Sequence, residues 1–155
     1  MSHTTTVKGL AIKSDDSIRA AVLALQAQGI EVELMENAIP RMFYSHQEEA
    51  VGKCNFVIKV KKAQYDVGLK KNNVGDYDLI FDEWGGGIRN QIGITKTDSS
   101  WDDDEKRLAH IAKFTREYNK HLVTSQFNAQ NIFDIEQVTG DNGEIQMVAN
   151  LSIWG

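Results

Sequence analysis

Three consecutive glycines, Gly85-Gly86-Gly87, interrupt the chain between Trp84 and Arg89. A triplet of this kind resembles a phosphate cradle, but the lysine and the Ser or Thr of the P-loop motif are absent and no helix is expected directly behind it. An aromatic ring and an arginine beside a mobile loop are suited to gripping a protein partner or a small anionic ligand. The alternative interpretation is that Trp84 anchors the loop to the core, and the residues themselves favour neither.

Basic residues form a second group that could do chemistry: Lys59, Lys61, Lys62, Lys70 and Lys71. Lys59 and Lys61 are expected on the outward face of one strand, with the others near its hairpin ends. With Tyr65 or Trp84 nearby for stacking, this lysine stripe could bind a phosphate-rich ligand or single-stranded nucleic acid. We prefer the interpretation that the lysines protect a strand edge from aggregation, and the net charge of −5 argues against bulk attraction to nucleic acid.

Signals for metal binding and nucleophilic catalysis are weaker. Carboxylates of the run Asp102-Asp103-Asp104-Glu105 could bind a divalent cation, but acidic residues are common in the first turn of a helix, which is the interpretation that we favour. Neither the four histidines nor the single cysteine has zinc-site spacing. Cys54 alternates in register with Phe56 and Ile58, which predicts a buried thiol. We therefore predict no catalytic residue, no metal and no cofactor.

The composition is that of an ordinary globular domain. Of 155 residues, 41% are apolar and 25% charged, which is enough to bury a core without disulfides. No apolar run approaches the ~20 residues of a membrane span, and the first residues lack the core of a signal peptide. We expect one domain over residues 1–155, located in the cytoplasm, and the sequence leaves its oligomeric state open.

Hydrophobic periodicity and turn residues predict an α+β fold. Amphipathic helices are expected over residues 15–28 and 99–126, the second opened by the acidic run. Alternating residues predict strands over 7–12, 30–34, 54–60, 65–69 and 77–81, and a closing hairpin over 132–138 and 145–153. A loop or edge segment is expected over 35–52, and a loop over 84–99. We predict a single antiparallel sheet of about six to seven strands with the two helices packed on one face.

Several short segments carry a family resemblance that runs nearly from end to end in order. They are Met1-Ser2-His3, Gln64-Tyr65-Asp66-Val67-Gly68-Leu69, Tyr77-Asp78-Leu79-Ile80-Phe81-Asp82 followed by Trp84, the helix from Tyr118 to Val123, and Asp141-Asn142-Gly143-Glu144-Ile145. The chain resembles the hypothetical chloroplast open reading frame thirty-five family of plastids, cyanobacteria, other bacteria and phages. The resemblance implies a small intracellular protein, and it brings no established activity or catalytic residue.

The functional prediction is a non-enzymatic binding or accessory protein that uses the glycine loop and an exposed sheet face. Two alternatives remain open at this point. One is a nucleic-acid-associated protein that uses the lysine stripe. The other is an enzyme whose site is assembled from distant residues, for which His46, Glu48, Tyr118 and His121 would have to meet in a pocket.

Overall fold

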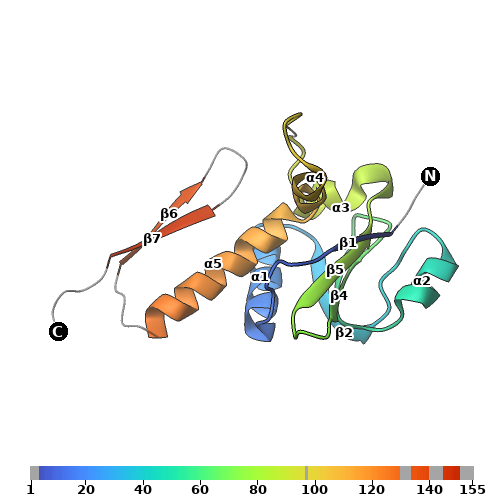
Figure 1. The fold of residues 1–155 in the computed structure, drawn as a ribbon, viewed down its shortest axis with the longest axis horizontal. Coiled ribbons are helices and arrows are strands. Elements are labelled where there is room, and N and C mark those ends of the chain that lie inside the picture. The colour runs from blue at the N-terminus through green and yellow to red at the C-terminus, as the bar shows by residue number, and fades with distance from the viewer. Residues whose placement is uncertain (1–3, 97, 130–133, 140–144, 151–155) are drawn as a thin grey trace.

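The computed structural model of the chain describes residues 4–96, 98–129, 134–139 and 145–150 (Figure 1). Its strands are β1 (Thr4–Val7), β2 (Val32–Ala38), β3 (Cys54–Val60), β4 (Val67–Lys71), β5 (Tyr77–Asp82), β6 (Asp134–Thr139) and β7 (Ile145–Asn150). Its helices are α1 (Asp15–Ala27), α2 (Ser45–Val51), α3 (Gly87–Ile92), α4 (Asp103–Ala109) and α5 (Ala112–Ala129), with a 3₁₀ turn, η1 (Trp84–Gly86), before α3.

The main sheet is antiparallel, with the strand order β1-β5-β4-β3-β2. Strands β2 to β5 form a meander, and β1 joins it at β5, so that the connection through α1 runs from one edge of the sheet to the other. The α+β class and the antiparallel sheet are confirmed, but the predicted count of six to seven strands is wrong. The sheet has five strands, because β6 and β7 pair with each other in a separate hairpin that contacts α5.

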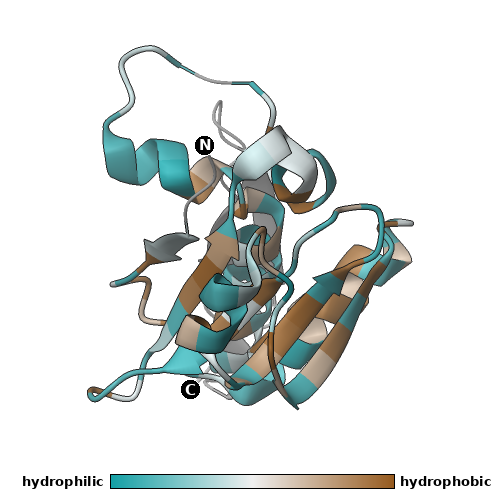
Figure 2. Ribbon diagram, turned by 90° about the vertical axis from the view of Figure 1, so that its right-hand side faces the viewer, coloured by the Kyte–Doolittle hydropathy of each residue, from teal (hydrophilic) through white to brown (hydrophobic). Residues whose placement is uncertain are grey.

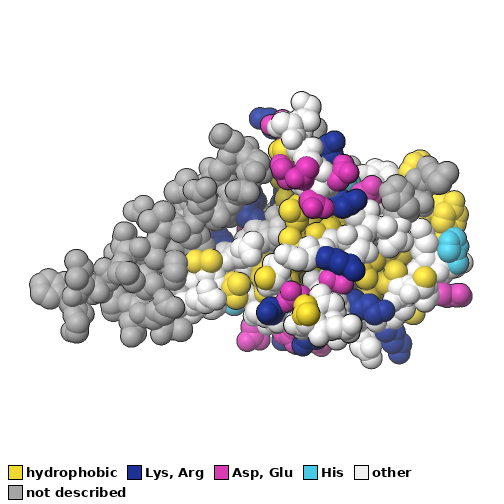
Figure 3. Space-filling model, viewed as in Figure 1, with side chains coloured by type: hydrophobic (Ala, Val, Ile, Leu, Met, Phe, Trp, Pro, Cys, Tyr) yellow, Lys and Arg dark blue, Asp and Glu magenta, His cyan; other side chains and the backbone are white. Residues whose placement is uncertain are grey.

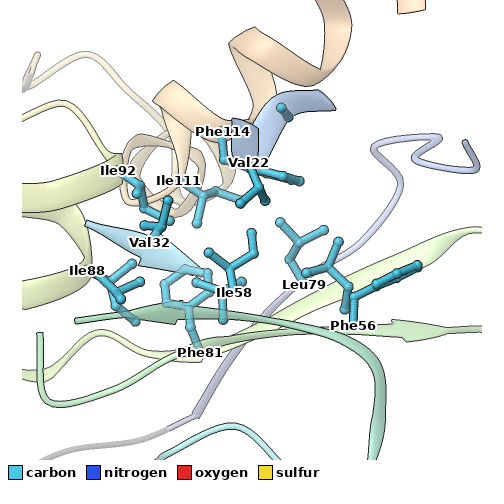
Figure 4. Close-up of a cluster of buried hydrophobic side chains, with 14 of the residues drawn as sticks. Val22, Val32, Phe56, Ile58, Leu79, Phe81, Ile88, Ile92, Ile111 and Phe114 are labelled. Carbon is cyan, nitrogen blue, oxygen red and sulfur yellow. The ribbon is translucent and has the colours of Figure 1, made fainter. Parts of the chain in front are cut away.

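Helices α1 and α5 cover one face of the sheet, as predicted (Figure 1). Figure 4 shows Val22 and Phe114 of these two helices above strand residues such as Ile58, Leu79 and Phe81, and Figure 2 shows how hydrophobic residues concentrate along the strands. Each of these strand residues is completely buried. The burial of the apolar core between these helices and the sheet supplies most of the driving force for folding.

Helix α1 begins where the sequence places it. The Ser14 side chain accepts a hydrogen bond from the Ser17 backbone N–H, which caps the first turn. Asp15 in that turn accepts a 2.7 Å hydrogen bond from the Tyr77 hydroxyl and so ties the helix to β5. Burial, and then this carboxylate, raise the pKa of Tyr77 to about 12, which keeps the phenol neutral.

The opposite face of the sheet is covered by the segment that carries α2. Met42 and Val51 pack there against Cys54 and Val57 of β3. The prediction of a loop or edge segment over 35–52 is therefore wrong for residues 45–51, which form α2, whereas β2 continues to Ala38 as an edge strand of the sheet. Cys54 is buried as predicted, and burial raises the pKa of its thiol, but it packs on this second face, away from its expected neighbours Phe56 and Ile58. The sequence missed α2 because this short helix contributes only Val51 to the core.

The first strand also differs from its prediction. It spans Thr4–Val7, whereas the expected strand over 7–12 is interrupted at Gly9 and Ala11, which both have left-handed backbone angles (φ 74° and 53°). An extended run cannot pass through two such residues. None of the helices in the described part of the chain combines the length and hydrophobicity that crossing a bilayer requires.

The long helix predicted over 99–126 is divided at His110 into α4 and α5. The Ala109 carbonyl, which would accept the next helical hydrogen bond, instead accepts a 2.8 Å bond from the Ile94 backbone N–H. This contact is close because Gly93 has no side chain: a methyl group there would overlap the Ala109 carbonyl oxygen and lie 2.6 Å from that of His110. The break is thus imposed by a tertiary contact, which no helical periodicity reveals.

Gly93→Ala should lower the free energy of unfolding by about 3 kcal/mol, since the added methyl group meets backbone atoms that cannot move aside. Urea unfolding followed by circular dichroism measures the loss. Gly87→Ala is the matched control, because its methyl group would lie 3.2 Å from the Ala63 Cβ, and its loss should be the smaller one. Equal losses in the two variants would contradict the proposed packing at Gly93.

Candidate functional site

Three loops converge at the end of the sheet where β3 and β5 finish. They are residues 40–44, residues 61–66 between β3 and β4, and residues 83–87 after β5. Arg41 joins the first two loops through Asp66, and Phe43 joins the first to the third through Asp82. The Ala63 methyl group lies beside the Cα of Gly87. The loop of the glycines and the turn of Lys61 and Lys62, which are separate candidates in the sequence, therefore occupy one region.

The Asp66 carboxylate is buried and satisfied by four donor groups. It accepts hydrogen bonds from the backbone N–H groups of Arg41 (2.9 Å) and Val60 (3.2 Å), and from the Arg41 Nε and Nη2 (2.8 Å to Oδ1). The Arg41 Nη2 also donates to the carbonyls of Val60 and Ala63. Hydrogen bonding to Asp66 raises the pKa of Arg41. This pair fixes residues 40–44 against the turn of residues 61–66.

A second buried carboxylate, Asp82 at the end of β5, is 1% exposed. Its Oδ1 accepts a 3.0 Å hydrogen bond from the Trp84 backbone N–H, and its Oδ2 accepts a 3.3 Å bond from that of Phe43. One side chain thus holds the backbone of two loops at the residues that carry large aromatic rings. Burial raises the pKa of the Tyr65 phenol, and the negative charge of Asp82 raises it further.

Large aromatic side chains form an exposed cluster above these carboxylates. We define the aromatic surface as Phe43, Tyr44 and Trp84, which are 40%, 43% and 47% exposed. The Phe43 ring packs edge-on against both neighbours, at 4.5 Å from Tyr44 and 6.0 Å from Trp84 between centroids. Buried Tyr65 lies beneath it at 6.2 Å, and exposed His46 stacks on Tyr44. Figure 3 shows hydrophobic side chains gathered next to a histidine at the end of the molecule where α2 lies.

The glycine loop forms more structure than its sequence predicts. Gly85 and Gly86 have left-handed angles (φ 74° and 68°), so that the chain turns through η1 and enters α3 at Gly87. The prediction of an irregular loop over 84–99 is therefore wrong for residues 84–92. The freedom of glycine to adopt these angles lets the chain reverse and leaves Trp84 exposed above Asp82.

Two lysines of the predicted stripe lie beside the same acidic residue. Lys59 pairs in register with Glu33 of β2, and the Lys61 ammonium lies 3.9 Å from that same carboxylate. Lys70 donates a 2.6 Å hydrogen bond to the Val51 carbonyl, and exposed Lys62 projects from the turn. Strand β3 lies between β2 and β4, so that the expectation of a lysine-protected sheet edge is wrong.

Arg89, the remaining predicted site residue, contacts residue 94, outside the aromatic surface. Its Nε donates a 2.6 Å hydrogen bond to the Ile94 carbonyl, and its charge acts on His110 at the break between α4 and α5. The His110 Nε2 lies 3.5 Å from the Glu83 carboxylate. Burial lowers the pKa of His110, and Glu83 opposes that shift. These three residues form a second polar cluster behind the glycine loop.

The residues named for an assembled catalytic site form two separate pairs. His46 and Glu48 lie on α2, whereas Tyr118 and His121 lie on α5 beside the start of α1. The Tyr118 hydroxyl accepts hydrogen bonds from the backbone N–H groups of Lys13 and Ser14, and Glu48 accepts one from Met42. His121 is 2.9 Å from the Ser17 hydroxyl, a spacing that would suit a nucleophile and its base, but Ser17 is 1% exposed. Asp102 caps α4 as predicted, and among the described residues no three His, Cys, Asp or Glu side chains converge to hold a metal.

Sequence reasoning missed Phe43, Tyr44 and the two carboxylates that position them. Phe43 and Tyr44 lie in a stretch without periodicity. The one signal in the sequence that could have pointed to them is that two aromatic residues follow closely behind Pro40. Asp66 directly precedes β4 and Asp82 ends β5, and aspartates at the ends of strands usually lie in solvent. Only the folded arrangement reveals that both are buried.

Comparisons with known proteins give no further guide. No family model matches the chain, and neither the curated proteins nor the solved structures contain a match to it. The resemblance to the hypothetical chloroplast open reading frame thirty-five family therefore stays a prediction.

Asp66→Ala should reduce the free energy of unfolding by about 3 kcal/mol, because it leaves the Arg41 Nε and the backbone N–H groups of Arg41 and Val60 without their acceptor. Urea denaturation measures the change. Asp104→Ala removes a carboxylate that is 87% exposed and pairs with Arg107 within one helix turn, so that its effect should stay below about 0.5 kcal/mol. A loss at Asp66 no larger than at Asp104 would show that the buried pair does not hold the loops.

Proposed function

We propose that the protein is a non-enzymatic binding or accessory protein, and that it recognises a protein partner through the aromatic surface of Phe43, Tyr44 and Trp84. The observation that carries this proposal is that three large aromatic rings are each about half exposed, while a buried carboxylate holds the backbone of two of them, Phe43 and Trp84. Aromatic residues are enriched at the energetic centres of protein interfaces.

Preorganisation favours this use of the surface. The Asp82 hydrogen bonds and the edge-on ring contacts hold Phe43 and Trp84 in place before a partner arrives. Binding then costs little conformational entropy in these side chains. More of the free energy gained by burying apolar surface therefore contributes to affinity. Exposed aromatic clusters without a partner would otherwise increase the risk of aggregation.

Nucleic acid is the weaker alternative. The rings of the aromatic surface meet at interplanar angles of 74° and 88°, whereas bases stack on parallel, exposed ring faces. Lys59 and Lys61 lie beside Glu33, which reduces the positive potential that would attract phosphates. The third alternative is an enzyme, and the pair of side chains best placed for catalysis is Ser17 and His121. Ser17 has almost no contact with solvent, so that a substrate could not reach its hydroxyl.

A cytoplasmic location and membership in the hypothetical chloroplast open reading frame thirty-five family are parts of the same proposal. The location rests on the single cysteine, which is buried as a free thiol. The family membership rests on the short sequence segments alone.

A photoreactive phenylalanine analogue at position 84 or 43 should crosslink one discrete protein in cells of the source organism. The same analogue at Leu23, which is 64% exposed on α1, is the matched control and should not crosslink that protein. The captured protein is then purified and its affinity measured by calorimetry. Trp84→Ala should weaken binding roughly 30-fold, as truncation of a central aromatic residue does, whereas Leu23→Ala should leave it unchanged.

Three outcomes would contradict the proposal. Crosslinking of the same protein from position 23 would show that the contact is not specific to the aromatic surface. An affinity that survives both Trp84→Ala and Phe43→Ala would exclude these rings from the interface. Binding of an oligonucleotide that falls with salt, and is lost when Lys59, Lys61 and Lys62 are changed to Gln, would support the nucleic-acid alternative instead.

A further inference from the structure

Two buried nitrogen atoms near the glycine loop have no hydrogen-bond partner among the described residues: Arg89 Nη2 and His110 Nδ1. A buried polar atom without a partner costs about as much as a lost hydrogen bond, and native proteins usually supply water, an ion or a ligand at such positions. These two atoms belong to residues far apart in sequence. Their unsatisfied state therefore needs a structural explanation.

A short chain of backbone contacts brings the two side chains into one neighbourhood. The Arg89 Nε donates to the Ile94 carbonyl (2.6 Å), and the Ile94 N–H donates to the carbonyl of Ala109, the residue before His110 (2.8 Å). Gly93 permits this approach because its Cα packs directly against the Ala109 and His110 carbonyls. Burial, and to a smaller extent the charge of Arg89, lowers the pKa of His110.

The other side of the imidazole already has a partner. The His110 Nε2 faces the Glu83 carboxylate at 3.5 Å, and the ring lies 5.7 Å from that of Phe81. Glu83 therefore orients the ring with one nitrogen toward itself and leaves Nδ1 for another contact. A carboxylate in this position also stabilises the imidazolium form if the ring takes up a proton.

We propose that Arg89 and His110 bind a small oxyanion, a carboxylate or phosphate group, behind the glycine loop. The anion accepts hydrogen bonds from Arg89 Nη2 and from a proton on His110 Nδ1, and both orphan atoms become satisfied. Binding takes up one proton at His110. With a singly charged anion, the bound cluster contains two positive groups, Arg89 and His110, and two negative groups, Glu83 and the anion, so that its charges balance.

This site is independent of the aromatic surface, because no ring of that surface contributes to it. Glu83 and Arg89 are the charged groups that act on His110, one favouring and one opposing its protonated form. Since the anion adds a second favourable charge, its binding should strengthen as the pH falls toward the ordinary histidine pKa of 6.5. A single bound water molecule is the competing occupant, and it would satisfy the same atoms without any such pH dependence.

The test is a titration of the wild-type protein with inorganic phosphate, and separately with acetate, followed by the nitrogen-15 resonances of the histidine rings. The His110 Nδ1 resonance should shift saturably with one of the two anions, while those of His46 and His121 serve as internal references. Arg89→Gln should weaken this binding roughly tenfold or more, because a charge-assisted donor is lost. Arg19→Gln removes an exposed guanidinium on α1 as the charge-matched control and should leave the affinity unchanged.

Saturation with phosphate alone assigns a phosphoryl ligand to the site, and saturation with acetate assigns a carboxylate. The absence of a saturable shift at His110 in the wild-type protein overturns the proposal and leaves water as the occupant. Equal shifts at His46 and His121, or an unchanged affinity in a folded Arg89→Gln variant, overturn it as well. Since the wild-type titration needs no substitution, the result does not depend on whether a variant folds.

Discussion

Two carboxylates with almost no contact with solvent, Asp66 and Asp82, determine how the loops are arranged at one end of the sheet. Burying a charge is costly unless hydrogen bonds and counter-charges compensate it. Asp66 meets this requirement with the Arg41 guanidinium and backbone donors, and Asp82 meets it with the N–H groups of Phe43 and Trp84. Because these donors must remain in place to offset the burial, the same interactions that satisfy the two carboxylates also hold the aromatic surface in position.

Local signals in the sequence were sufficient to predict the helices and strands that have a clear hydrophobic periodicity or a capping residue. The stripe of Ile18, Ala21, Val22 and Leu25 behind Ser14 defines α1, and the alternation in β3 and β5 defines the meander. Trp84 and the glycines were recognised as unusual because no helix or strand accommodates them. The surface next to Trp84 was only half predicted, since its other rings follow Pro40 in a segment whose pattern indicates nothing regular.

Contacts between distant segments explain what the sequence could not predict. The pairing of β1 with β5 and the exclusion of β6 and β7 from the main sheet depend on tertiary packing, as does the helix break at His110, where Gly93 meets the chain. The same holds for polar residues. Asp82 has the local pattern of a solvated strand end, and Arg89 that of a loop residue. Yet Asp82 is buried beneath aromatic rings, and the Arg89 Nε donates a hydrogen bond to the Ile94 carbonyl.

The central claim is that Asp82 holds Phe43 and Trp84 in place, and amide hydrogen exchange tests it most directly. In the wild-type protein the backbone N–H groups of these two residues should exchange slowly, because each donates to the Asp82 carboxylate. In Asp82→Ala both should exchange roughly tenfold faster or more, while the N–H of Leu79 within β5 stays protected. Unchanged exchange at Phe43 and Trp84 in a folded Asp82→Ala variant would contradict the claim.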